Sequence, residues 1–266
     1  MPSLPQTPPP DLAEALASDE ARLGGWGRVL AWYAEISSTN DVAVSLAETG
    51  ADEGVVVAAD MQHAGRGRVG RHWFSPPGAG VYLSCVLRPP PGVARLLTVA
   101  AGLGVAEGVE RATGLSPLVK WPNDLLLGHR KVGGILAEAG TSRDGRPFVV
   151  LGVGVNVTPH ALPRDLVGVA TSLEAERGGA VDRARVFVEC LAGVRARYAD
   201  LGAGLAPIVV DGWRARAQSI VGRAVEWDMN GRVRAGVVDG IADDAALLIR
   251  CDDGQVRVTS GEVRWR

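Results

Sequence analysis

The chain has 266 residues, of which 47% are hydrophobic and 22% are charged, and its formal net charge at pH 7 is −2. This length and apolar content predict a sizeable core, organised as one large domain and a smaller one. The nearly balanced charge argues against a protein drawn as a whole to nucleic acid or to an anionic membrane, so neither is expected as a partner. The cysteines lack the paired spacing of a metal site or a disulfide framework, which favours a reducing cytoplasm.

The N-terminal segment, "MPSLPQTPPPD", is rich in proline and lacks the basic and apolar regions of a secretory signal. We interpret residues 1–25 as a disordered tail with a short helix within residues 11–23. No apolar run approaches the roughly 18 residues that a membrane span requires. A membrane-bound protein is therefore not expected.

Downstream, β-branched runs alternate with segments of helical periodicity. "SSTN" directly follows the first predicted strand, and Ser38, Thr39 or Asn40 can cap the helix after it, because their side-chain oxygens accept from first-turn N–H groups. We expect strands at 28–36, 54–60, 81–89 and 147–157, and helices at 40–50, 94–114, 182–200 and 206–220.

A third kind of pattern occurs in two places, where short apolar runs are separated by turn residues. Residues 116–140 resemble a hairpin that turns near Gly128. From Gly222 onward, short β-runs are interrupted by "NG", "DD" and "DG", which are strong hairpin signals. The predicted fold class is α+β, with a mixed-sheet domain at 26–221 and a small β-barrel at 222–266.

The segment "HAGRGRVGRHW" (63–73) joins two predicted core strands and contains Arg66, Arg68 and Arg71 without any acidic residue. Glycines let backbone N–H groups approach an anion, and guanidinium groups form bidentate hydrogen bonds to phosphate or carboxylate. An anionic substrate is therefore predicted. A solvated mobile loop and nonspecific nucleic-acid contact are the alternatives, the latter disfavoured because no wider basic stripe is present.

A second candidate site is "KWPNDLLLGHRKVGGILAE" (120–138), in which Lys120, Asp124 and Lys131 share the predicted hairpin with two adjacent glycines. Charged side chains gathered at a glycine-rich turn indicate a binding or catalytic site. Ordinary surface lysines are the alternative for both cations, and "WPND" is also typical of a simple β-turn.

Together, "SSTN", "QHAGRGRVGRHW", "KWPND", "KVGGILAE" and "GVGVN" resemble the ordered motifs of the biotin protein ligases, over roughly residues 26–266. The resemblance implies a catalytic domain of the biotin/lipoate ligase type followed by an SH3-like domain. It also implies formation of biotinyl-5′-AMP from biotin and ATP, then transfer of biotin to a lysine of a biotin carboxyl carrier protein. Because about 60 residues are needed for the DNA-binding domain of some members, and 25 precede Trp26, a ligase without repressor function is expected.

The resemblance also implies roles for individual residues, with Mg²⁺ accompanying ATP rather than occupying a fixed protein site. The implied catalytic residues are Lys131, Arg68, Asp124 and Lys120, with Lys131 bridging the biotin carboxyl and the α-phosphate and Asp124 a candidate for orienting or deprotonating the acceptor lysine. The implied biotin-binding residues are Ser38, Thr39, Asn40, Gln62, Gly65, Arg66, Gly67, Arg68, Lys131 and Gly134. The implied nucleotide-binding residues are Arg66, Arg68, Arg71, Trp73, Asn123, Lys131 and Asn156.

Two alternatives of different kinds remain at this point. A lipoate protein ligase has the same catalytic fold and acyl-adenylate chemistry, but that family lacks the arginine motif found here. A noncatalytic module that binds biotin or a nucleotide is the second, and the complete set of Arg68, Lys120 and Lys131 argues against it. The sequence leaves the oligomeric state open, a homodimer included.

Overall fold

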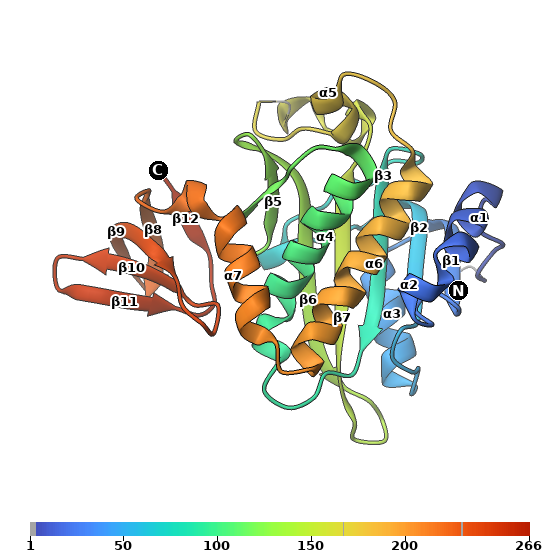
Figure 1. Ribbon diagram of the computed structural model, residues 1–266, viewed down its shortest axis with the longest axis horizontal. Coiled ribbons are helices and arrows are strands. Elements are labelled where there is room, and N and C mark those ends of the chain that lie inside the picture. The colour runs from blue at the N-terminus through green and yellow to red at the C-terminus, as the bar shows by residue number, and fades with distance from the viewer. Residues whose placement is uncertain (1–3, 167, 230) are drawn as a thin grey trace.

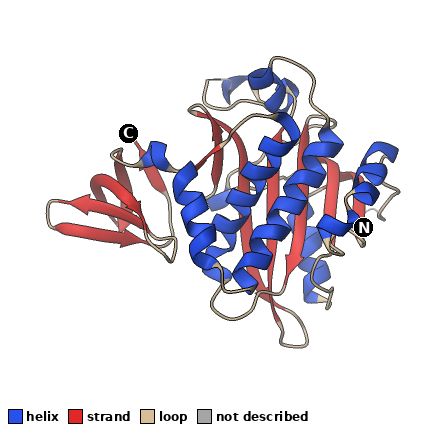
Figure 2. Cartoon of the chain, in the orientation of Figure 1, coloured by secondary structure: helices blue, strands red, loops and turns tan. Residues whose placement is uncertain are grey.

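The computed structural model describes residues 4–166, 168–229 and 231–266. Within these residues the chain forms a large domain, built on a mixed sheet with helices on both faces, and a small C-terminal domain that projects to one side (Figure 1). Figure 2 shows that the small domain consists mainly of strands, whereas helices cover the sheet of the large one. The predicted α+β class is confirmed.

In the described residues, seven strands form the large sheet in the order β1-β2-β3-β7-β6-β5-β4. β1 and β2 are parallel, and the other neighbours pair antiparallel, so the sheet is mixed as predicted. The strands are β1 (Leu30–Ile36), β2 (Val56–Gln62), β3 (Gly80–Leu87), β4 (Leu118–Lys120), β5 (Asp124–Leu127), β6 (Arg130–Thr141) and β7 (Pro147–Asn156).

The two faces of this sheet bury separate clusters of apolar side chains. One face packs against α3 (Thr39–Glu48), and the other against the long helices α4 (Leu97–Thr113) and α6 (Arg183–Gly202), with α7 (Ala206–Arg216) beside them. A Cβ at Gly104 would lie 2.4 Å from the carbonyl oxygen of Gly193. Glycine at the crossing therefore lets α4 and α6 approach more closely than any side chain would allow.

The N-terminal segment corrects one prediction. Residues 4–9, expected to be disordered, lie along the edge strand β1, where Gln6 N donates to Trp32 O at 2.7 Å and Gln6 Oε1 accepts from Ala34 N at 3.3 Å. An edge strand offers unpaired backbone groups, and this short segment satisfies some of them. The expected helix at 11–23 is interrupted at Asp19, giving α1 (Pro10–Ser18) and α2 (Glu20–Leu23). Residues 1–3 lie outside the described residues.

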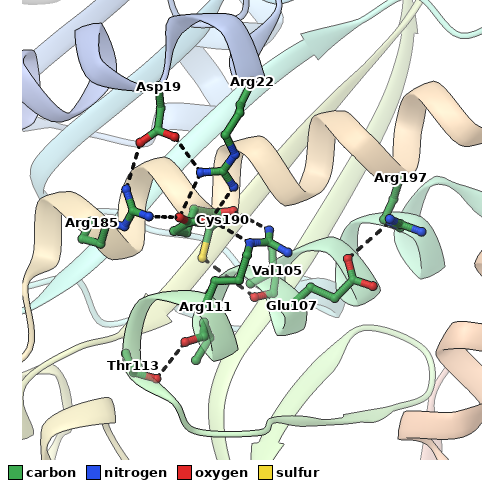
Figure 3. A network of polar contacts seen from close by, with 11 residues as sticks. Asp19, Arg22, Val105, Glu107, Arg111, Thr113, Arg185, Cys190 and Arg197 are labelled. Carbon is green, nitrogen blue, oxygen red and sulfur yellow. Dashed lines mark hydrogen bonds and ion pairs between the residues drawn. The ribbon is translucent and has the colours of Figure 1, made fainter.

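The N-terminal helices are fixed to α6 by a charged network, drawn in Figure 3. At its centre is Glu189, whose side chain is 1% exposed and accepts from Arg22 Nη2 at 2.6 Å and from Arg111 Nε at 2.7 Å. Arg185 also pairs with this carboxylate, and Asp19 pairs with both Arg22 and Arg185. Burial opposes ionisation of Glu189, but the hydrogen bonds from Arg22 and Arg111 outweigh it and lower the pKa to about 2.

The C-terminal domain is an antiparallel sheet of five strands in the described residues, in the order β11-β10-β9-β8-β12. Two predicted hairpin turns are confirmed, at 243–244 between β9 and β10 and at 253–254 between β10 and β11. The third falls at Asn230, outside the described residues. The strands are β8 (Ala224–Met229), β9 (Arg232–Ile241), β10 (Leu247–Cys251), β11 (Gly254–Val258) and β12 (Val263–Trp265).

The remaining elements refine the predicted boundaries. The helix predicted at 206–220 is shorter than expected. It ends at Arg216, and a separate 3₁₀ turn (Gln218–Ile220) follows it. The short helix α5 (Leu173–Arg177) begins after Ser172, whose side chain accepts from Ala175 N. Further 3₁₀ turns lie at Arg68–Gly70, Ala94–Leu96, Pro159–Ala161 and Arg164–Leu166. None of the helices in the described part of the chain combines the length and the hydropathy needed to cross a bilayer.

Candidate functional site

A cavity of about 410 Å³ lies between the arginine loop, one end of the large sheet and the C-terminal domain. Its volume is within the usual range for a small-molecule site. The predicted site residues that line it are Ser38, Thr39, Asn40, Gln62, Arg66, Gly67, Arg68, Arg71, Trp73, Lys120, Asn123, Asp124, Lys131, Gly134 and Asn156. Gly65 lies outside this lining: a Cβ there would be 2.5 Å from Trp73 O, so glycine lets the two arms of the loop close together.

The parallel pairing of β1 and β2 explains how distant motifs meet. In this register Ile36 is opposite Gln62, so both strands end at the same edge of the sheet. "SSTN" follows β1, and the arginine loop follows β2. Backbone hydrogen bonds from His63 N to Ile36 O and from Ala64 N to Ser37 O, both 2.9 Å, then hold the two segments side by side.

One end of the cavity is formed by buried neutral polar groups. Gln62 Oε1 accepts from Thr39 N at 2.9 Å and from Thr39 Oγ1 at 3.1 Å, while its Nε2 donates to Ser75 Oγ at 2.9 Å. The expected side-chain cap is not formed: Ser38 is the N-cap residue of α3 but makes no cap hydrogen bond. Gln62 instead satisfies the backbone N–H of Thr39, so one side chain both stabilises the helix start and belongs to the site.

The other end of the cavity is cationic. Lys131 Nζ lies 2.6 Å from Asp124 Oδ1 and 5.4 Å from the centre of the Trp73 ring. The predicted hairpin is corrected here, because Lys120 belongs to a separate strand, β4, which pairs with β5 so that Lys120 is opposite Asp124. Three strands therefore bring the two lysines and the aspartate together.

Lys120 reaches the C-terminal domain. Its Nζ lies 5.1 Å from the centre of the Trp265 ring. Burial lowers the pKa of Lys120, an effect that nearby Asp124 opposes. A second link between the domains is the hydrogen bond from Trp121 Nε1 to Ala245 O, 2.9 Å long. The site is therefore completed by residues on both sides of the domain boundary.

The arginine loop has no acid in its own sequence, but the fold supplies partners from elsewhere. Arg66 Nη2 lies 2.6 Å from Asp41 Oδ1 and 2.9 Å from Glu138 Oε2. Arg71 forms an ion pair with Glu262 of the C-terminal domain. Carboxylates therefore hold these two arginines in place. An anionic substrate would either displace the carboxylates from the guanidinium groups or bind to the donors that they leave free.

Arg68 differs from its neighbours because its partners are neutral. Its Nη2 donates to Gly261 O at 2.9 Å, and its Nη1 lies 3.5 Å from Asn123 Oδ1. Burial lowers the pKa of Arg68, with nearby Asp124 opposing this, although an arginine stays protonated in proteins. A half-buried guanidinium without a bound carboxylate is suited to receive an anion.

Two glycines on one face of β7 make room for the site. A Cβ at Gly152 would lie 2.2 Å from Asn40 Oδ1, and one at Gly154 would lie 2.6 Å from the Trp73 ring. Their alternation within a β-branched strand was a signal available in the sequence. At the end of the same strand, Asn156 Nδ2 donates to Thr171 O at 3.1 Å. Among the site residues that the sequence did not single out are Ser84, Glu138, Gly152, Gly154, Glu262 and Trp265.

The described residues contain no cluster of three or more His, Cys, Asp or Glu side chains that could hold a metal ion. Isolated carboxylates in the cavity, such as Asp124, are instead paired with cations. The side chains that line the cavity can form hydrogen bonds, stabilise negative charge and transfer protons.

Two family models match the chain. The biotin/lipoate A/B protein ligase family matches residues 32–156, and the biotin protein ligase C terminal domain matches residues 220–264.

Similar proteins are found among curated sequences and solved structures. The chain is 36% identical over 257 residues to a bifunctional ligase/repressor BirA of Bacillus subtilis, covering 93% of this chain and 78% of that protein. It is also 36% identical over 246 residues to a biotin–[acetyl-CoA-carboxylase] ligase of Mycobacterium tuberculosis, covering 90% and 89%. A biotin protein ligase of Aquifex aeolicus, solved with biotin and ATP, aligns with a TM-score of 0.77 at 28% identity, covering 90% of this chain and 99% of that one.

Proposed function

Because the chain belongs to the biotin protein ligases of the biotin/lipoate A/B protein ligase family, we propose how its own residues divide the work of the reaction. The activity is formation of biotinyl-AMP followed by transfer of biotin to a carrier protein. The observation that carries the proposal is the single cavity with a neutral hydrogen-bonding end and a cationic end. The neutral end binds the biotin ring, and the cationic end binds the carboxyl group and the phosphates.

In the first half-reaction, a biotin carboxylate oxygen attacks the α-phosphate of ATP, and the bond to pyrophosphate breaks. Two negative groups must approach, so preorganised cations lower the barrier. Lys131, already positioned by Asp124 and Trp73, bridges the carboxylate and the α-phosphate. Arg68 and Lys120 add positive charge, and Trp73 offers a ring face to the adenine.

In the second half-reaction, the amine of an acceptor lysine attacks the acyl carbon, and AMP leaves. The amine must be neutral to attack, so a base has to accept its proton. Asp124 lies 2.6 Å from Lys131 Nζ. We assign it the role of orienting and deprotonating the acceptor, because it is a carboxylate that lines the cavity beside the bridging lysine.

Mg²⁺ is proposed to enter with ATP, bound to its phosphates, where it supplies further neutralisation of phosphate charge. The described residues hold no metal cluster that would serve as a resident site. The chain contributes instead the guanidinium and ammonium groups that surround the phosphates.

The macromolecular partner is proposed to be the biotin carboxyl carrier domain of a cytoplasmic carboxylase. The lipoate alternative is disfavoured, because the relatives that match most of the chain are biotin ligases. A ring pocket of buried hydrogen-bonding groups, such as Thr39 and Gln62, also fits a urea better than a dithiolane.

The proposed roles are tested by biotin-dependent ATP–pyrophosphate exchange. Replacing Lys131 with alanine removes a donor aimed at the charge that develops in the transition state. Exchange should fall about 10²- to 10³-fold, the usual effect of losing one such donor. Biotin-independent exchange serves as the blank.

Arg146→Ala is the control, because Arg146 lies in the exposed turn between β6 and β7, where it pairs with Asp144. It should leave exchange unchanged. Exchange by the Lys131→Ala variant within a few-fold of wild type would remove Lys131 from the mechanism.

A further inference from the structure

Glu138, the last residue of the "KVGGILAE" motif, links the "SSTN" segment to the arginine loop through one carboxylate oxygen. Its Oε2 accepts from Asn40 Nδ2 at 2.6 Å and from Arg66 Nη2 at 2.9 Å. Asn40 belongs to the neutral end, and Arg66 belongs to the arginine loop. A single side chain on β6 therefore contacts two segments that are distant in sequence.

The charge of Glu138 fixes which way the Asn40 amide faces. A carboxylate paired with an arginine can only accept hydrogen bonds, so it selects the NH₂ group of the amide. The amide oxygen then points the other way, where it lies 2.6 Å from Ser84 Oγ. The Asn40 amide also lies against Gly152, where a Cβ would be 2.2 Å from the amide oxygen. Nothing larger than glycine would leave space for this arrangement.

The orientation of the Asn40 amide determines the direction of the next hydrogen bonds in the buried network. Ser84 has one hydroxyl proton, and it donates this proton to Asn40 Oδ1. Its oxygen is then an acceptor toward Thr39 Oγ1, which lies 2.8 Å away. Thr39 has a second acceptor within reach, Gln62 Oε1 at 3.1 Å, and in either case its proton is used inside the network. Ser84 is fully buried, so the lone pairs of Thr39 and Asn40, which line the cavity, are what remains for a ligand.

We propose that Glu138 is a positioning residue that makes the neutral end of the cavity a hydrogen-bond acceptor for the two N–H groups of a cyclic urea. This inference rests on the proposed assignment of that end to the biotin ring. It gives a physical basis for selectivity, because a ring without N–H groups, such as a dithiolane, would leave buried acceptors unpaired. Glu138 acts through Asn40 and does not touch the reacting atoms.

Glu138→Gln tests the proposal, since it retains the shape but removes the charge and introduces N–H donors. The Asn40 amide and the Ser84 hydroxyl can then reverse. In ATP–pyrophosphate exchange, KM for biotin should rise about tenfold, the effect of leaving one buried hydrogen-bonding group unpaired in the complex. KM for ATP should change by less than about threefold. Glu138→Asp retains the charge and should restore part of the loss.

Asp41→Asn is the matched comparison, because Asp41 pairs with the same guanidinium, whereas the hydrogen bond from the Asn40 amide goes to Glu138. Its effect on KM for biotin should be several-fold smaller than that of Glu138→Gln. Equal effects would mean that Glu138 acts through Arg66 alone, which would overturn the proposal. An unchanged KM for biotin in Glu138→Gln would overturn it as well.

Calorimetric titration with biotin and thermal melting complete the experiment. Dissociation constants should follow the KM values, and unchanged melting temperatures exclude misfolding as the cause. Asn40→Ala tests the assignment of the neutral end to the biotin ring separately from the role of Glu138. If it does not weaken biotin binding, the assignment of this end to the ring fails. If it does and Glu138→Gln does not, only the role of Glu138 fails.

Discussion

Four cations that line the cavity have aromatic or acidic partners brought from other elements, Arg66 with its two carboxylates among them. Lys131 lies between Asp124 and Trp73, Lys120 lies over Trp265, and Arg71 pairs with Glu262. Such pairing lets several positive charges share a small volume before a phosphate arrives. Arg68 is the exception, since its contacts are to a backbone carbonyl and an amide.

This difference makes Arg68 the residue expected to retain the adenylate. Arg68→Gly removes the guanidinium, so biotinyl-AMP should leave the cavity sooner and acylate lysines of unrelated proteins. Incubation with biotin, ATP and serum albumin, followed by blotting for biotin, should show albumin labelling by the variant and very little by wild type.

Arg95→Gly provides the control for that experiment, because Arg95 is exposed and lies before α4, away from the cavity lining. It should label only a carrier domain. Equal and negligible albumin labelling by all three proteins, with equal labelling of the carrier, would show that Arg68 does not retain the intermediate.

At the scale of elements, the arginine loop has firm ends and a strained tip. Its ends are fixed by backbone hydrogen bonds, including Trp73 N to Gly65 O at 2.8 Å. At the tip, Val69 has φ of 56° and is 72% exposed. A β-branched residue in the left-handed region is unfavourable, so the tip is held in place by contacts of Arg68 and Arg71 rather than by local preference.

We therefore predict that the tip, residues 67–72, exchanges its amide hydrogens rapidly in the free protein and slowly with biotin and ATP. Ligand phosphates add partners for the arginines, which favours one ordered conformation. Hydrogen exchange followed by mass spectrometry measures this, and β3, buried along its whole length, serves as the internal reference. Equal exchange of the tip with and without ligands would contradict the prediction.

At the scale of the whole molecule, stability and catalysis depend on different charged clusters. The Glu189 network joins α2, α4 and α6 on the helical side of the sheet, whereas the cavity lies at the edge where β1 and β2 end. Replacing Glu189 with glutamine should lower the free energy of unfolding by about 2 kcal/mol at pH 7, because partly buried arginines lose their carboxylate. KM for biotin should not change.

The pH dependence follows from the direction of the shift. The folded-state pKa of Glu189 is about 2, below its ordinary value of 4.5, so its contribution is complete above pH 4.5 and is lost as the pH falls toward 2. Urea unfolding at several pH values should show the difference between wild type and Glu189→Gln shrinking over that window. Asp253→Asn, which breaks an exposed pair with Arg234, should have a much smaller effect. A difference independent of pH would contradict the role of the Glu189 charge.

The sequence by itself determined the order of the elements, and it named many of the residues that line the cavity. Local periodicity predicted β1, β2, β3, β7 and the long helices. The spacing of apolar residues along an element indicates both its type and the face that it buries. Fifteen of the predicted site residues line the cavity; most of them were implied by the resemblance of the ordered motifs to those of the biotin protein ligases rather than by a local pattern.

Only the tertiary structure decided which charges meet. Asp41, Glu138 and Glu262 reach the arginine loop from α3, β6 and the C-terminal domain, and Trp265 reaches Lys120 from the last strand. No local pattern encodes such contacts, because they depend on strand register and on how the two domains pack. The order of residues 4–9 has the same origin, since a proline-rich segment has no preference for β-pairing until an unpaired edge strand lies beside it.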